Sequence, residues 1–343
     1  MTPTEARYYT KLSDQRVRCE LCPWQCVVQP GKRGRCEVRE NRDGVYYSLV
    51  YGEIASYHTD PIEKKPLFHF LPGTRAFSIA TAGCNVDCKF CQNWELARRR
   101  PEELRSVSFT PEDIVRHAKS QDSRSVAFTY NEPTIFNEFV QDVAACGREE
   151  GVRSVVISNG FINPKPLTDL CRVIDAYKVD LKSFSEDYYR DVVGGRLAPV
   201  LDTLVTLKEH SIWCEIVYLV VPTLNDDPTM VREMARWILH ELGHDVPIHF
   251  SRFYPKYKLR NLPPTPIKTL ERLRKVALDA GLHYAYLGNV PGHDGENTAC
   301  PSCGKQIIGR MGYRIFENHI QNGACGYCGH SVAGVWDTMQ EGL

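Results

Sequence analysis

The chain has 343 residues, of which 43% are hydrophobic and 24% are charged, and its formal net charge is zero. These values are typical of a globular protein and leave room for one large α/β barrel with small appended modules. A net charge of zero gives no broad positive field for nucleic acid or an anionic membrane, and the first residues do not resemble a signal peptide, so we expect a cytoplasmic protein.

Fourteen cysteines are unusual for a cytosolic enzyme, and eleven of them fall in three tight clusters. In a large cytosolic chain such clusters bind metal more often than they form disulfides. The clusters suggest three regions: a cysteine-rich segment over residues 1–75, a barrel over residues 76–290, and a metal-binding module over residues 291–343.

The first cluster consists of Cys19, Cys22, Cys26 and Cys36, in a segment with several glycines and prolines. Four thiolates complete the coordination of a zinc ion or of a second [4Fe–4S] cluster. Both metals stay open, with zinc slightly favoured as a structural clip and an electron relay as the alternative. The charged residues at 58–69 are interpreted as an exposed loop or as a lid over the barrel mouth.

Residues 76–290 alternate between strand-like and helix-like segments. We expect strands at residues 76–80, 126–129, 155–158, 178–181, 214–221 and 248–251, and helices at residues 110–120, 134–149, 166–174, 200–210, 227–242 and 267–280. This alternation predicts parallel β-α-β units. Six units indicate an α/β fold of the partial (β/α)6 TIM-type barrel class, although a flat doubly wound sheet has the same pattern.

Polar and unusual residues follow the expected strands where each strand ends. In either architecture the chemistry lies at the carboxyl ends of the strands. The sequence therefore predicts one shared active site at the ends of successive strands. The residues there are Gly83 and Cys84, Asn131 and Glu132, Asn159 and Gly160, Asp180 and Lys182, Thr223 to Asp226, and Arg252.

Cys84, Cys88 and Cys91 have the spacing C-x3-C-x2-C, directly after the first expected strand. Three thiolates hold three irons of a [4Fe–4S] cubane and leave the fourth iron open to chelate a small molecule. A closed zinc site is the alternative, but it requires a fourth ligand that this motif does not supply. The motif therefore predicts a [4Fe–4S] cluster, and reduction of such a cluster can drive one-electron cleavage of a bound sulfonium.

The last region contains two C-x2-C-G motifs, formed by Cys300 and Cys303 and by Cys325 and Cys328. Together they supply four thiolates, which is enough to close a tetrahedral site. We expect a zinc ribbon that stabilises a small fold without a sufficient core, with rubredoxin-like iron or an auxiliary cluster as the alternatives.

Several of these residues lie in motifs that resemble those of radical S-adenosylmethionine (SAM) enzymes. The cysteine motif, with the aromatic Phe90 before its last cysteine, resembles the signature of that superfamily. Residues 130–133 resemble the loop that binds the methionine amino group, without its two glycines. Residues 158–160, 180–182 and 220–227 resemble the T-N-G, D-x-K and V-V-P…D-D segments of enzymes that activate glycyl radical enzymes.

A closer resemblance covers nearly the whole chain. Residues 63–66, 83–85, 91–94 and 249–253, together with the cysteine tail, are similar to the radical SAM component of the AmmeMemoRadiSam system. The resemblance implies a [4Fe–4S] cluster, bound SAM and an external electron donor of flavodoxin or ferredoxin type. It also makes a Memo-type or AMMECR-type protein a candidate partner.

The resemblance implies a role for each residue around the cofactor. We expect Glu132 or the Asn131 carbonyl to accept from the SAM amino group, and Ser158 and Asn159 to donate to its carboxylate and ribose. Residues 220–222 would form an apolar wall for adenine. The full set of expected cofactor-binding residues is Phe90, Asn131, Glu132, Ser158, Asn159, Asp180, Lys182, Val220, Pro222 and His249.

The implied reaction is reductive cleavage of SAM to methionine and a 5′-deoxyadenosyl radical, which abstracts hydrogen from a substrate. Two kinds of substrate stay open: a glycyl residue of a partner protein, as in glycyl-radical-enzyme activases, or another protein or small-molecule C–H bond. Whether SAM is consumed or regenerated stays open, as does the oligomeric state. A non-enzymatic zinc-ribbon binding protein is the alternative from a different class, and iron and sulfide analysis separates the two.

Overall fold

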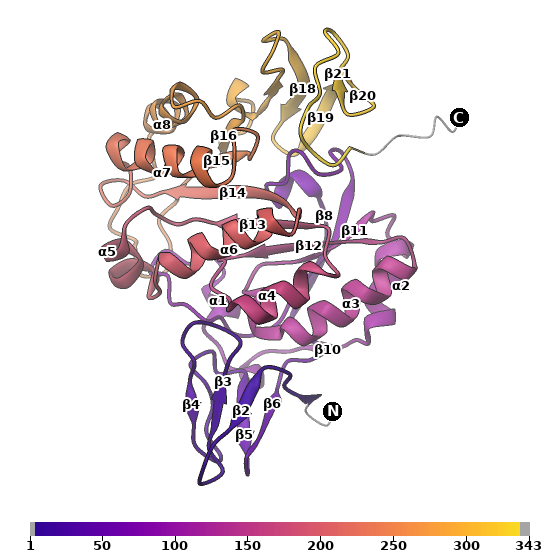
Figure 1. Cartoon of the computed structure of the whole chain (residues 1–343), viewed down its shortest axis with the longest axis vertical. Helices are drawn as coiled ribbons and strands as arrows, with labels where there is room; N and C mark the ends of the chain where they lie inside the picture. The colour runs from indigo at the N-terminus through magenta and orange to yellow at the C-terminus, as the bar shows by residue number, and fades with distance from the viewer. Residues whose placement is uncertain (1–3, 337–343) are drawn as a thin grey trace.

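The computed structural model describes residues 4–336, and its centre is an eight-stranded sheet with helices on its outer face (Figure 1). Seven strands are parallel, and one edge strand pairs antiparallel with its neighbour. In pairing order the strands are β16 (Ala285–Gly288), β15 (Ile248–Arg252), β14 (Trp213–Val220), β13 (Ala176–Asp180), β12 (Arg153–Ser158), β11 (Ser125–Phe128), β9 (Arg75–Ala80) and β8 (Ser56–Pro61).

The predicted alternation of strands and helices is confirmed, and the fold is a partial barrel. All four residues of β11 are buried, as are four of the five in β13, because helices cover one side of the sheet and the barrel interior covers the other. Strands buried on both faces have continuous apolar sequences, which is why the chain shows apolar runs here and no strict alternation.

Two strands of this sheet were not expected. The helix at residues 267–279 is followed by β16, which adds a seventh parallel strand. At the other edge β8 pairs antiparallel with β9, so the sheet begins at Ser56, within the segment expected over residues 1–75. β8 was missed because its sequence, SYHTDP, is polar and ends in proline, a pattern that is tolerated on an edge strand.

The helices lie close to their expected positions, and neighbouring helices pack side by side around the sheet. Among residues 4–336 no helix is both long and apolar enough to cross a bilayer. The α-helices are α1 (Trp94–Ala97), α2 (Pro111–Ser120), α3 (Asn137–Glu149), α4 (Pro164–Cys171), α5 (Glu186–Tyr188), α6 (Ala198–Glu209), α7 (Pro228–Glu241) and α8 (Ile267–Asp279).

Helix α2 begins where the sequence predicts. The Thr110 hydroxyl accepts from the Asp113 backbone N–H at 3.2 Å, and the Asp113 carboxylate accepts from the Thr110 N–H at 3.1 Å. This capping box satisfies two backbone donors that a helix start leaves unpaired. Ile114, Val115 and Ala118 then face the sheet and are buried.

The two ends of the chain form small β-structures outside the barrel (Figure 1). The amino-terminal segment contains two three-stranded sheets, and the carboxyl-terminal module forms another with a two-stranded hairpin. Their strands are β1 (Thr4–Glu5), β2 (Tyr9–Lys11), β3 (Val17–Cys19), β4 (Val27–Val28), β5 (Arg39–Arg42), β6 (Val45–Ser48), β17 (Thr298–Ala299), β18 (Gln306–Met311), β19 (Arg314–Asn318), β20 (Ile320–Gln321) and β21 (Ala324–Cys325). A short pair, β7 (Glu53–Ile54) and β10 (Val107–Ser108), lies beside the barrel.

A buried arginine fastens the carboxyl-terminal module to the barrel. The Arg310 guanidinium, on β18, donates to the Phe68 carbonyl at 2.8 Å, to the Glu296 carbonyl at 3.1 Å and to the Thr298 hydroxyl at 2.7 Å. The guanidinium also lies 4.2 Å from the centre of the Phe68 ring. Burying a charge is costly unless it is hydrogen-bonded, and the bond to the Phe68 carbonyl joins the module to the segment before β9.

Replacing Arg310 with alanine should lower the free energy of unfolding by about 3 kcal/mol or more, because several buried acceptors lose charged donors at once. Arg314, exposed on the neighbouring strand β19, provides the matched control. Its replacement with alanine should change stability by less than about 0.5 kcal/mol. Denaturant unfolding measures the stability of both variants. If the Arg310 variant were as stable as the parent chain, the anchoring role would be contradicted.

Candidate functional site

A cavity of about 510 Å³ opens at the carboxyl ends of the barrel strands. Its size is within the range of sites that hold a cofactor or a drug-sized ligand. Most of the residues predicted from the sequence line it together: Cys84, Cys88, Phe90, Cys91, Asn131, Glu132, Asn159, Asp180 and Lys182.

The central cysteine site, Cys84, Cys88 and Cys91, lies on the loop that follows β9. Backbone N–H groups of Asp87 and Lys89 donate to carbonyls at residues 192–193, at 3.0 and 2.9 Å, and tie this loop to the segment after α5. Gly83, with φ of +87°, comes directly before the loop, and a Cβ there would lie 2.7 Å from the Cys36 carbonyl. The close packing explains why glycine occupies this position.

All three cysteines line the cavity, but their sulfurs are not gathered as closely as the ligands of a single metal ion. Among the described residues they do not form a group with all sulfurs within 4.8 Å of one another. A single tetrahedral zinc ion needs sulfurs about 3.8 Å apart, from Zn–S bonds of about 2.3 Å. A cubane spreads its ligands over separate irons, so these residues fit a [4Fe–4S] cluster.

Asn131 holds the start of the cysteine loop in place. Its side-chain amide donates to the Thr81 hydroxyl and to the Gly83 carbonyl, both at 3.1 Å. The amide oxygen accepts from the Thr81 backbone N–H at 3.3 Å. The side chain of Asn131 therefore connects the end of β11 to the residues just before Cys84.

The Glu132 carboxylate is buried, and it accepts four hydrogen bonds. One oxygen accepts from the Thr134 N–H, the Thr134 hydroxyl and the Ser158 hydroxyl, at 2.6 to 3.0 Å. The other accepts from the Asn159 N–H at 2.8 Å. Burial raises the pKa of the Glu132 carboxyl, although these hydrogen bonds oppose the shift. Because a carboxylate offers about four acceptor positions, Glu132 acts as a brace between β11 and β12.

Asn159 connects this brace to the central cysteine site. Its side-chain amide donates to the Asn85 amide oxygen at 2.9 Å and lies 3.9 Å from the Cys84 sulfur. Asn85 in turn donates to the Phe161 carbonyl at 2.8 Å. The residues after β9, β11 and β12 therefore form one hydrogen-bonded unit around Cys84.

Two lysines share one carboxylate deeper in the cavity. Asp180 forms ion pairs with Lys178 and, at 3.3 Å, with Lys182. Burial opposes ionisation of Asp180, but the two ammonium groups prevail and lower the pKa of its carboxyl. The trio carries an excess positive charge, and Lys182 also lies 5.6 Å from the centre of the Phe90 ring. Lys178 was missed by the sequence analysis, although a lysine within a buried strand was a usable signal.

A second charged group lies at the cavity edge, on residues interpreted from the sequence as an exposed loop or a lid. Lys65 is 2% exposed and pairs with Asp60, which also accepts from Lys64 and from the Tyr130 hydroxyl. Burial lowers the pKa of the Lys65 ammonium to about 8, while Asp60 opposes the shift. The exposed-loop interpretation is therefore wrong for Asp60 and Lys65, because Asp60 lies on the edge strand β8 and Lys65 is buried against its carboxylate.

Four of the expected cofactor-binding residues do not line the cavity: Ser158, Val220, Pro222 and His249. Successive side chains of a strand point to opposite faces, so Ile157 and Leu219 line the cavity while Ser158 and Val220 point away. His249 lies near the amino end of β15, where it pairs with the buried Glu215 at 2.7 Å. The sequence pattern did not show which face of each strand points into the cavity, or that His249 lies at the end of its strand away from the cavity.

The carboxyl-terminal module brings its four cysteines together as expected. Cys300, Cys303, Cys325 and Cys328 form a group whose sulfurs lie within 4.8 Å of one another. The Cys300–Cys328 and Cys303–Cys325 sulfur distances are 3.7 and 3.8 Å. These match the edge of about 3.8 Å expected for a tetrahedral zinc–thiolate site with bonds of about 2.3 Å. We call this group the ribbon site.

The chain is similar to proteins that share this architecture. The family model of the Radical SAM superfamily matches residues 78–238. The chain is 43% identical over 330 residues to an uncharacterized protein, MJ0808, of Methanocaldococcus jannaschii, covering 96% of this chain and 98% of that protein. It is 24% identical over 222 residues to the pyruvate formate-lyase 1-activating enzyme of Escherichia coli K12, covering 60% of this chain and 89% of that enzyme.

A solved structure also has a similar fold. A radical SAM methyltransferase from Sphaerobacter thermophilus aligns with a TM-score of 0.51 at 16% identity, covering 66% of this chain and 71% of that one.

Replacing Glu132 with glutamine should lower the free energy of unfolding by about 1–3 kcal/mol, because an amide group faces N–H and O–H donors and leaves some of them unpaired. Glu149→Gln, at the exposed end of α3, is the control and should be nearly neutral. Denaturant unfolding at neutral pH measures both. An unchanged stability for Glu132→Gln would show that the brace is not needed.

Proposed function

Because the chain belongs to the radical SAM superfamily and is an enzyme, we propose that it cleaves SAM reductively at a [4Fe–4S] cluster held by Cys84, Cys88 and Cys91. The observation that carries the proposal is the single cavity that contains these three cysteines together with Asn159, Asp180 and Lys182. When bound, the reduced cluster supplies the electron that converts SAM to methionine and a 5′-deoxyadenosyl radical, which takes a hydrogen atom from the substrate.

The charged residues of the cavity would orient a zwitterionic ligand. Lys178 and Lys182 share one carboxylate, Asp180, so an ammonium group is left to bind the SAM carboxylate. Since the Glu132 oxygens already accept four hydrogen bonds, backbone carbonyls near Asn131 are the better acceptors for the amino group. Phe90, 4% exposed beside Lys182, would keep water from the cluster.

The cavity is large enough to hold part of a substrate beside SAM. Lys64, Lys65 and Tyr130 line its outer edge, so the substrate would meet cationic and phenolic groups there. The chain is similar to the pyruvate formate-lyase 1-activating enzyme over 89% of that enzyme. This similarity favours a glycyl residue of a partner protein as one candidate substrate. A Memo-type or AMMECR-type protein is another candidate partner.

Reduction would come from outside the chain. We propose a cytoplasmic donor of flavodoxin or ferredoxin type, because iron–sulfur thiolates suit a reducing compartment and all fourteen cysteines are free. The ribbon site is proposed to bind zinc, with a structural role, on the basis of its sulfur spacing.

Changing Cys84, Cys88 and Cys91 to alanine should remove about four irons per chain and abolish formation of 5′-deoxyadenosine, because the open iron is lost with its cubane. Cys146→Ala, on the outer helix α3, should leave both unchanged. Iron analysis and product detection by mass spectrometry, under anaerobic conditions with dithionite, provide the measurement. SAM cleavage by the triple variant would refute the proposal.

Changing Cys303 and Cys328 to serine should release about one zinc ion per chain, because each change removes a ligand of a closed four-thiolate site. The iron content should stay unchanged. Metal analysis of variant and parent chains tests this, and a parent chain without zinc would rule out the assignment.

A further inference from the structure

The four amino-terminal cysteines surround a small cavity beside the barrel. Cys19, Cys22, Cys26 and Cys36 all line it, and we call them the amino-terminal cysteine site. All four are free thiols, so no disulfide uses them. Four thiols that line one cavity can act together as metal ligands. The distances between their sulfurs indicate whether they bind a single ion or a cluster.

These thiols are more widely spaced than a single metal ion requires. Within residues 4–336 no three of them lie within 4.8 Å of one another, whereas the sulfurs of the ribbon site all do. The ribbon site therefore serves as an internal reference for a zinc-sized group. A four-iron cubane gives each thiolate its own iron, and such ligands are separated across the cluster.

Two buried donors line the same cavity without a partner. Nη1 of Arg39 and the hydroxyl of Tyr46 are both buried, and neither has a hydrogen-bond partner in the described structure. The rest of the Arg39 guanidinium is satisfied by Glu138 and by the Ile135 carbonyl. A buried donor left unpaired is costly, so these two groups point to an acceptor in the cavity. Sulfides and thiolates of an iron–sulfur cluster are such acceptors.

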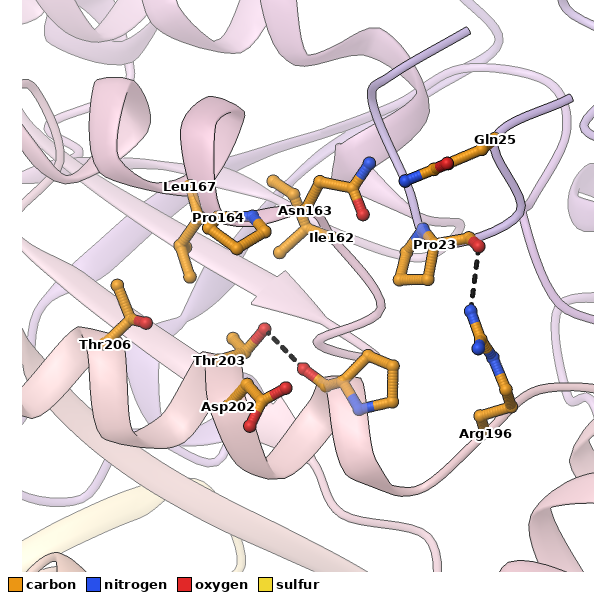
Figure 2. A pocket seen from close by; sticks show the side chains of 11 residues that line it. Pro23, Gln25, Ile162, Asn163, Pro164, Leu167, Arg196, Asp202, Thr203 and Thr206 are labelled. Carbon is orange, nitrogen blue, oxygen red and sulfur yellow. Dashed lines mark hydrogen bonds between the residues drawn. The ribbon is translucent and has the colours of Figure 1, made fainter.

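The site is also firmly attached to the barrel, as a cluster ligand set needs to be. The Asn163 side chain donates to the Glu20 carbonyl at 2.6 Å, and the Arg196 guanidinium donates to the Pro23 carbonyl at 2.8 Å. Figure 2 shows Arg196 reaching Pro23, and Gln25 on the same side of the pocket. These contacts attach the segment to the residues just before α4 and α6.

The amino-terminal cysteine site and the central cysteine site are neighbours. Asn85, which follows Cys84 directly, lines the amino-terminal cavity. The Trp24 indole N–H donates to the Asn85 carbonyl at 2.7 Å. A Cβ on Gly83 would lie 2.7 Å from the Cys36 carbonyl, so the two cysteine loops pack against each other.

From these contacts we propose that the amino-terminal cysteine site holds a second [4Fe–4S] cluster, which passes electrons to the cluster at the central cysteine site. One electron from an external donor of flavodoxin or ferredoxin type reduces the second cluster. The same electron then moves to the central cluster, and the second cluster returns to its oxidised state. The transfer rests on the proposed function, whereas the presence of the second cluster does not.

The chain with Cys84, Cys88 and Cys91 changed to alanine provides the direct test. Prepared anaerobically, it should retain about four irons and about four acid-labile sulfides, in addition to about one zinc ion. After reduction with dithionite it should give the paramagnetic signal of a reduced cubane. Adding SAM should leave this signal unchanged, because every iron already has a thiolate ligand. The Cys146→Ala control should hold about eight irons.

A triple variant that contains zinc and no iron would overturn the second cluster, and so would one with about two irons. A parent chain with about eight irons that does not cleave SAM would instead overturn the proposed function, so the two failures are distinguishable.

The relay is tested with Cys19 and Cys36 changed to serine. SAM cleavage by this variant should fall by about tenfold or more with a reduced flavodoxin as donor. With dithionite it should stay near the parent rate, because this small reductant reaches the central cluster directly. Equal rates of parent and variant with flavodoxin would overturn the relay.

Discussion

The buried carboxylate of Glu132 is the contact on which the rest of the site depends. Leaving a carboxylate in the protein interior is costly unless its acceptor positions are filled, and here four donors fill them. These donors belong to the turns after β11 and β12, so the charge fixes the two strand ends relative to each other. Asn159, held by its N–H, is thereby placed 3.9 Å from the Cys84 sulfur.

The cysteine loop has little regular structure of its own, and its position is set by its neighbours. Asn131 holds it at Gly83, Asn159 holds it at Asn85, and backbone contacts with residues 192–193 hold its far side. A loop supported from several strand ends keeps its thiols in place before any cofactor binds. The asparagines at these strand ends therefore have two roles, since Asn131 and Asn159 line the cavity and also hydrogen-bond to the loop.

The chain uses cysteine clusters of two kinds, and sulfur spacing separates them. The ribbon site brings sulfurs to 3.7 and 3.8 Å, which suits one ion. The central and amino-terminal cysteine sites spread their sulfurs around a space, which suits a multinuclear cluster. These two sites meet at the same loop, because the Trp24 indole N–H donates to the Asn85 carbonyl.

The spacing of residues along the chain was enough to predict the six central strands and their helices, the three cysteine clusters and the residue types at the strand ends. These features depend on near neighbours in the chain, where spacing is enough. Three features depend on the folded chain: β8 joins the sheet, Ser158 and Val220 point away from the cavity, and Glu132 accepts four hydrogen bonds. The tertiary structure also decided the spacing of the thiols, because distances between side chains on different loops are set by packing and strand register, which the spacing of cysteines along the sequence does not encode.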